Sequence, residues 1–90
     1  MPREAYHPNA YLTEVKNVKR GLQARTKILT ALDRHPYDAK TIAKEAEIHY
    51  NVVIHHLRLL ETEGIVERKR GRPNVWELTG LGQKSLVNAF

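Results

Sequence analysis

Apolar residues recur at helical spacing over the first third of the chain, where they form two stripes. The first stripe begins near Ala10 and contains Tyr11, Leu12, Val15, Val18 and Leu22. The second contains Leu22, Ile28, Leu29 and Leu32. Gly21 is predicted to kink or break the helix between them, because glycine weakens helix interiors. His35-Pro36 ends the second helix, since proline disfavours helix in the residue before it.

Two shorter helices are predicted next, with a turn between them. Asp38 is a suitable N-cap for a helix over 39–46, whose inner face carries Ile42, Ala43 and Ala46. Ile48 lies in the turn. A helix over 50–63 then places Val53, His56, Leu57 and Leu60 at core spacing, and Gly64 ends it.

The pattern changes after Gly64, where "IVERKR" and "VWEL" flank "GRPN". Strand-forming residues around a glycine- and proline-containing turn predict a β-hairpin, with Trp76 and Leu78 on the face that rests on the helices. Thr79 would cap a final helix containing Leu81, Leu86 and Val87. The predicted fold class is therefore mainly α with a small β-hairpin, and with helices on both sides of it.

Composition narrows the class of protein. Ninety residues fit one domain with a modest core, since chains this short bury only about 60% of their unfolded surface. The chain contains no cysteine, which excludes disulfides and thiolate metal sites. No apolar run approaches the roughly 20 residues of a membrane span, so we expect a soluble, cytoplasmic protein. The net charge of +5 favours a polyanion as partner.

Positive charge is concentrated in two segments. Residues 66–72, "VERKRGR", hold four cations against the single acid Glu67. The other segment spans the join between the N-terminal stripe and the next helix, and it contains Lys16, Lys19, Arg20, Arg25 and Lys27. Segregated charge of this kind is typical of a surface that faces an anion.

The stretch "TIAKEAEIHYNVVIHHLRLLETEGIVERKRGRPNVWELTGLGQKSL" resembles the winged helix-turn-helix domain of ArsR- and MarR-type transcriptional regulators. The resemblance covers residues 22–88 and implies a winged helix-turn-helix domain over 18–90, preceded by a helical N-terminal segment, 1–17. The turn departs from the family, with Glu47 and His49 in place of the usual glycine and serine. We therefore expect the cap of the 50–63 helix to be weak or to move to Asn51.

The resemblance implies a transcriptional regulator that binds double-stranded DNA sequence-specifically and is located at the nucleoid. The 50–63 helix would enter the major groove, and the hairpin, 65–78, would lie on phosphates or in the minor groove. The predicted DNA-binding residues are His49, Tyr50, Asn51, Val52, His55, Arg58, Arg68, Lys69, Arg70 and Arg72. Two alternatives are a weakly specific chromatin-type protein and a winged helix that binds other proteins in a transcription or replication assembly.

The sequence gives no support for a metal site, a cofactor, a small-molecule effector or enzymatic chemistry. Adjacent His55 and His56 point about 100° apart on a helix, which is poor chelation geometry, and no His-x-x-x-His is present. We expect His56 at the edge of the core with a hydrogen bond. Neither a phosphate-binding glycine loop nor a nucleophile-elbow motif is present, and Ser85 is the only serine.

Leftover apolar residues predict a homodimer. The first stripe has no obvious partner within so small a domain, and the C-terminal end is also apolar. The predicted interface residues are Tyr11, Leu12, Val15, Val18, Leu86 and Phe90. A twofold axis would place two recognition helices in successive major grooves, about 34 Å apart. The alternative is that the N-terminal stripe folds back on its own domain.

Overall fold

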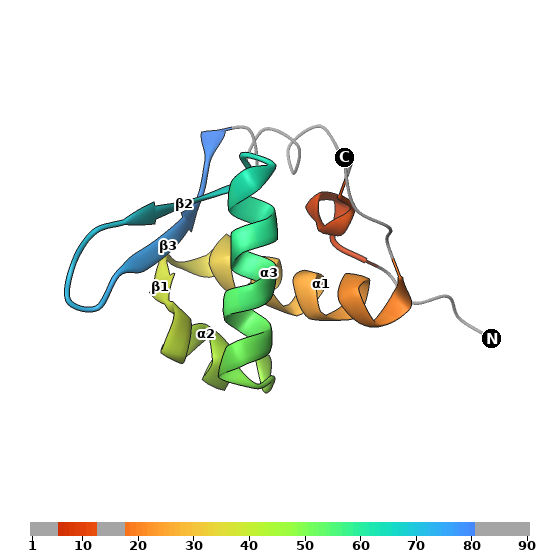
Figure 1. Ribbon diagram of the computed structural model, residues 1–90, viewed down its shortest axis with the longest axis horizontal. Coiled ribbons are helices and arrows are strands. Elements are labelled where there is room, and N and C mark those ends of the chain that lie inside the picture. Colours follow the sequence, from red (N-terminus) through yellow and green to blue (C-terminus); the bar gives the residue numbers. More distant parts are fainter. Residues whose placement is uncertain (1–5, 13–17, 81–90) are drawn as a thin grey trace.

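The computed structural model describes residues 6–12 and 18–80, which form a helical domain with a small antiparallel sheet at one side (Figure 1). The elements in chain order are the 3-10 turn η1 (Pro8–Ala10), α1 (Lys19–Arg34), β1 (Tyr37–Asp38), α2 (Ala39–Ala46), α3 (Tyr50–Thr62), β2 (Val66–Lys69) and β3 (Val75–Leu78). This is the winged helix-turn-helix fold that the sequence predicts. The final helix predicted after Thr79 lies outside the described residues.

The core lies where α1, α2 and α3 meet the sheet. The largest fully buried side chains are Ile28, Leu29, Ile42, Val53, Leu57, Leu60 and Val66. Trp76 and Leu78 are also buried, which confirms the predicted inner face of the second strand. Each such side chain stabilises the fold by about 1.5–3 kcal/mol. The sheet therefore holds the hairpin at a fixed position beside α3.

The helix-turn-helix has the predicted bounds within one residue, but the cap of α3 differs from expectation. Asp38 occupies the N-cap of α2 and accepts a hydrogen bond from the Thr41 hydroxyl, which lowers the pKa of the Asp38 carboxyl. Glu47 ends α2 in the left-handed conformation, with φ 56° and ψ 43°. The N-cap of α3 is His49, whose Nδ1 accepts from the Asn51 backbone N–H at 3.1 Å. The expected shift of the cap to Asn51 is therefore wrong.

The N-terminal segment also differs from expectation over its described part. Instead of a helix from Ala10, Pro8–Ala10 forms a single 3-10 turn and Tyr11 is extended. The His7 side chain accepts from the Asn9 backbone N–H at 3.1 Å and so caps this turn. Gly21 does not break the helix, because α1 runs through it from Lys19 to Arg34.

The sheet has the strand order β1-β3-β2, and the sequence pattern did not indicate β1. The hairpin register pairs Val66 with Leu78 and Arg68 with Trp76. Because cross-strand partners share a face and side chains alternate along a strand, the hairpin has two distinct faces. The inner face consists of Val66, Arg68, Trp76 and Leu78. The outer face consists of Glu67, Lys69, Val75 and Glu77.

Candidate nucleic-acid interface

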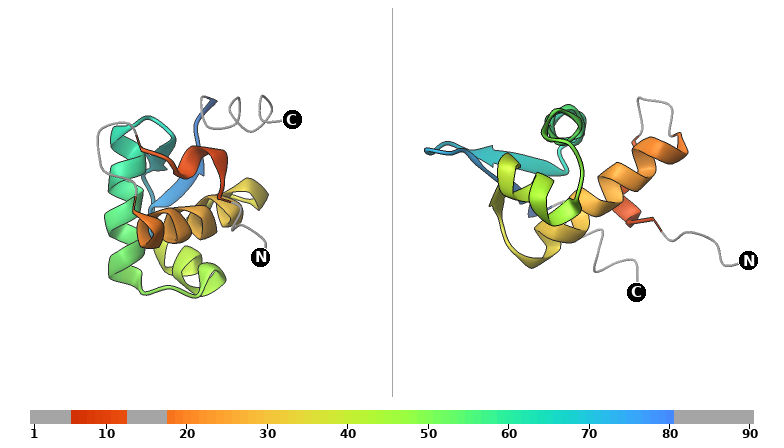
Figure 2. Two further views of the ribbon diagram at one scale, coloured as in Figure 1. Left: turned by 90° about the vertical axis from the view of Figure 1, so that its right-hand side faces the viewer. Right: turned by 90° about the horizontal axis from the view of Figure 1, so that it is seen from below.

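One side of α3 is free of the core. Val53, Leu57 and Leu60 are fully buried, whereas Asn51, His55, Arg58 and Thr62 are exposed, as predicted. The Thr62 hydroxyl donates to the Arg58 carbonyl at 3.0 Å, so it is used within the helix. The right-hand view of Figure 2 looks along α3 and shows the hairpin extending to one side of it. The exposed face of α3 and the hairpin thus belong to one surface.

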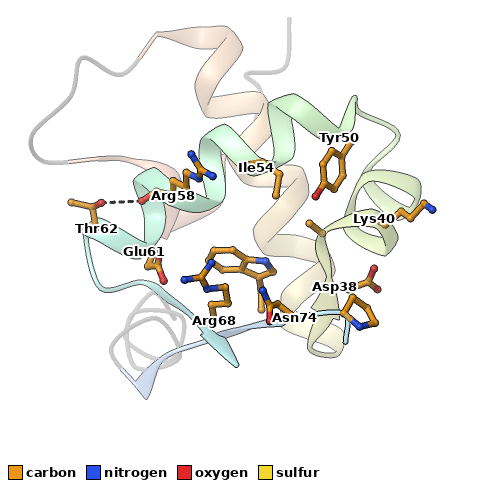
Figure 3. Close-up of a pocket in the computed structure, with 12 residues that line it drawn as sticks. Asp38, Lys40, Tyr50, Ile54, Arg58, Glu61, Thr62, Arg68 and Asn74 are labelled. Atoms are coloured by element: carbon orange, nitrogen blue, oxygen red, sulfur yellow. Dashed lines mark hydrogen bonds between the residues drawn. The ribbon is translucent and has the colours of Figure 1, made fainter. Parts of the chain in front are cut away.

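A groove of about 1180 Å³ separates α3 from the inner face of the hairpin (Figure 3). From α3 it is lined by Tyr50, Ile54, Arg58, Glu61 and Thr62. The remaining lining residues are Asp38, Ala39, Lys40, Arg68, Pro73, Asn74 and Trp76. Of the predicted DNA-binding residues, the structure brings Tyr50, Arg58 and Arg68 together here.

Arg68 is held in this groove by Trp76. The guanidinium carbon of Arg68 lies 5.8 Å from the centre of the Trp76 ring, which is a cation–π arrangement. Trp76 is itself only 5% exposed, so the surface on which Arg68 rests is rigid. Among residues 6–12 and 18–80, no carboxylate forms an ion pair with Arg58 or Arg68. Both guanidinium groups are therefore available to an anion from outside.

Lys69, the next residue, is on the outer face and is neutralised. Its Nζ lies 3.0 Å from Glu67 Oε1 and 3.5 Å from Glu77 Oε1. The bond to Glu67 raises the pKa of Lys69, and the same contact lowers the pKa of Glu67. The sequence pattern does not distinguish the hairpin cations, but the strand register places Arg68 on the inner face and Lys69 on the outer face.

Arg70 and Arg72 lie in the connection between β2 and β3, and both are exposed. The connection is held by a hydrogen bond from the Gly71 backbone N–H to Asn74 Oδ1, at 3.1 Å. The remaining predicted DNA-binding residues, His49 and Val52, are exposed at the start of α3 but do not line the groove.

The other basic segment contains a cation that serves a different purpose. Arg25 is 2% exposed, and its Nε donates to the Ala10 carbonyl. Its Nη1 lies 3.3 Å from Nδ1 of His56, which is 8% exposed and is thus at the core edge with a hydrogen bond, as predicted. Burial lowers the pKa of Arg25, and burial together with the nearby Arg25 lowers the pKa of His56 to about 4.

Gly21 makes room for this arginine. A Cβ at position 21 would lie 2.9 Å from Arg25 Nη1, which is closer than carbon and nitrogen normally approach. A glycine inside a helix costs about 1 kcal/mol relative to alanine. Glycine nevertheless suits this position, because a residue without a side chain leaves room for the buried guanidinium of Arg25.

The predicted interface residues of the N-terminal stripe differ in exposure. Leu12 is buried in the core, and the segment is tied down where His7 Nε2 donates to Asp33 Oδ2 at 3.0 Å. Tyr11 and Val18, in contrast, are each 51% exposed. Val15, Leu86 and Phe90 lie outside the described residues.

Within the described ranges, no three histidine, aspartate or glutamate side chains are grouped so that they could hold a metal ion. None of the helices in those ranges has the length and apolar composition required to cross a membrane.

Sequence reasoning missed several residues of the groove, in particular Lys40 and Asn74. Lys40 sits in the first turn of α2, where the sequence shows only an isolated lysine. Ile54 follows Tyr50 by four residues and shares its side of the helix, so helical spacing does indicate its place in the groove.

Comparison with known proteins assigns the chain to a family. Residues 23–68 match the model of the bacterial regulatory proteins of the arsR family, and this match covers more than half of the chain. The chain belongs to the ArsR family. No curated protein matches this ArsR-family chain.

Two solved structures illustrate the likeness in fold. The transcriptional repressor CouR, solved bound to a 23-mer DNA duplex, has a TM-score of 0.65 at 24% identity, over 81% of this chain and 53% of that one. A double mutant of Lactococcus lactis ZitR has a TM-score of 0.65 at 20% identity, over 84% of this chain and 52% of that one. The ArsR-family chain thus spans about half the length of each.

Proposed function

We propose that this chain is a transcriptional regulator that binds double-stranded DNA sequence-specifically, at the nucleoid in the cytoplasm. The observation that carries the proposal is the position of Arg58 and Arg68 on opposite sides of one groove, next to the exposed face of α3. An α-helix with its side chains is about 10–12 Å across, which fits a major groove about 12 Å wide. Membership of the ArsR family supports the same function.

In this proposal α3 reads bases and the hairpin binds the backbone. Arg58 would pair with guanine, a bidentate contact worth about 1–3 kcal/mol of discrimination. Arg68 would bind a phosphate beside α3, and the exposed Arg70 and Arg72 would contact phosphates or the minor groove further out. His49 and His55 are exposed beside these contacts and complete the base-facing surface.

Binding to random and selected duplexes across salt concentration tests this function. We expect selected duplexes to bind at least about a thousandfold more tightly than random ones. Arg58→Ala should relax the choice of sequence, whereas Arg70→Ala should weaken all duplexes alike and flatten the salt slope by about one unit. A salt slope without sequence preference would instead indicate a chromatin-type protein. Absence of duplex binding would indicate a protein–protein module.

We also propose a homodimer, supported by the exposure of Tyr11 and Val18. Two half-exposed apolar side chains offer surface for a twofold contact. Sedimentation of the full chain should show a dimer, and Tyr11→Ser with Val18→Ser should raise the dimer dissociation constant. A full chain that sediments as a monomer at high concentration contradicts the proposal.

A further inference from the structure

The first turn of α3 exposes large apolar side chains where a soluble helix usually presents polar ones. Tyr50 is 48% exposed and Val52 is 39% exposed, whereas Val53, the next residue, is fully buried. Among the residues that the structure describes, the other exposed large apolar side chains are Tyr11 and Val18, far away along the chain at the N-terminal segment. The exposed apolar side chains of α3 are therefore not an extension of the buried core.

Helix geometry places these two side chains on either side of Asn51. Successive residues in an α-helix point about 100° apart, so Asn51 points about 100° away from each of them and the three side chains together span about 200° around the first turn. In the described structure the backbone N–H of Asn51 donates to His49, while its exposed side-chain amide makes no hydrogen bond. The turn thus presents one amide between two apolar groups.

Only one apolar group marks the edge of a base in the major groove, and it is the C5-methyl group of thymine. An asparagine amide, for its part, matches the N6 and N7 atoms of adenine. All three side chains are therefore complementary to the same kind of base pair. Building on the proposed function, we infer that the first turn of α3 selects A·T pairs, with Asn51 on adenine and Tyr50 and Val52 on thymine methyl groups.

The charge around the turn favours DNA over an apolar protein surface as the occupant. Tyr50 lines the same groove as Lys40, Arg58 and Arg68. Within residues 6–12 and 18–80, none of these three cations forms an ion pair. A protein partner that covered Tyr50 would have to desolvate them, whereas a duplex supplies phosphates next to its methyl groups.

A double-mutant cycle between protein and DNA tests the inference. The probe is a selected duplex in which single thymines are replaced by deoxyuridine, which removes only the methyl group. We expect the replacement under Val52 to weaken binding of the wild type three- to fivefold, as for one buried methyl group. Val52→Ala should lose the same factor on the thymine duplex and almost nothing further on the deoxyuridine duplex. Tyr50→Ser should behave likewise at a different thymine.

Arg58→Ala is the matched control, because Arg58 is also exposed on α3 but carries no apolar contact in the proposal. It should weaken binding and still show the full deoxyuridine effect. If Val52→Ala and Tyr50→Ser also keep the full effect, or if no thymine replacement affects the wild type, the inference is overturned while the proposed function stands. If no duplex is selected over random sequence, the proposed function itself fails, and the inference fails with it.

Discussion

Arg25 and Arg68 come from the two basic segments of the sequence, yet the structure gives them opposite surroundings. Arg25 is 2% exposed, and it donates to the Ala10 carbonyl and to His56. Arg68 is exposed and rests on the face of the Trp76 ring in an open groove. One arginine joins the N-terminal turn to α3, and the other is available to a ligand. Local charge density does not distinguish these roles.

Their positions relative to the apolar pattern do distinguish them. Arg25 lies three residues after Leu22 and three before Ile28, which places it within the buried stripe of α1. Arg68 shares the inner face of the hairpin with Trp76, but it lies further from the helices than Val66. A basic residue on a core stripe is thus expected to have a structural role. It should be left out when a charged surface is inferred from the sequence.

The largest expected effect is on folding. Arg25→Ala should lower the free energy of unfolding by about 2–4 kcal/mol, because it leaves two buried acceptors without their donor and opens a cavity. Arg68→Ala should change it by no more than about 0.5 kcal/mol. Urea denaturation followed by circular dichroism measures both. Arg25→Lys, which restores a charged donor, should recover part of the loss; equal effects at the two positions would remove the contrast between them.

The partner of Arg25 should make stability depend on pH. The pKa of His56 is lowered to about 4 in the folded protein, compared with about 6.5 for an unperturbed histidine. Between about pH 4 and about pH 6.5 the unfolded chain binds more protons than the folded protein. The stability contributed by neutral His56 is therefore fully present above about pH 7 and decreases as the pH is lowered. The expected loss is about 2 kcal/mol between pH 7 and pH 5. Denaturation of the wild type and of His56→Gln over this range should show a flatter profile in the variant; parallel profiles would contradict the assignment.

The two faces of the hairpin should also differ in their contribution to DNA binding. Arg68→Ala should weaken duplex binding about fivefold and reduce the salt slope by about 0.9, as expected for one lost phosphate contact. Lys69→Ala should weaken binding less than twofold, since Glu67 and Glu77 already neutralise Lys69. Binding isotherms at several salt concentrations measure both quantities. Equal losses for the two variants would mean that the outer face also contacts DNA.

The smallest expected effect has the opposite sign. Replacing both acids, Glu67→Gln and Glu77→Gln, removes negative charge next to the groove and frees Lys69. Affinity for any duplex should rise about twofold at low salt and return to the wild-type value at high salt, because screening weakens exposed charges. The same isotherms detect the change. An unchanged affinity at low salt would place the outer face too far from the backbone to matter.

The sequence predicts α1, α2, α3 and the hairpin well, because their apolar spacing is regular and their ends carry strong signals such as Asp38 and Gly64. It fails where single side chains replace the usual capping residues. His7 and His49 cap by accepting a backbone N–H, which histidine seldom does, so the pattern gave no reason to expect it.

The candidate site was predicted in part for a similar reason. The exposed positions of α3 follow from helical periodicity alone, and they are confirmed. The difference between Arg68 and Lys69 depends on the strand register, and Lys40 enters the groove only through the packing of α2 against α3. Such relations between separate elements are absent from the local pattern.

The cap of α3 also fixes the tautomer of the neutral His49 ring. Because Nδ1 of His49 accepts from the Asn51 backbone, the neutral imidazole must carry its hydrogen on Nε2. This tautomer presents a hydrogen-bond donor outward from the start of the helix, suited to a phosphate oxygen or to N7 of a purine. The histidine that replaces the family's usual serine thus caps the helix with one nitrogen and leaves the other free to take part in the proposed recognition.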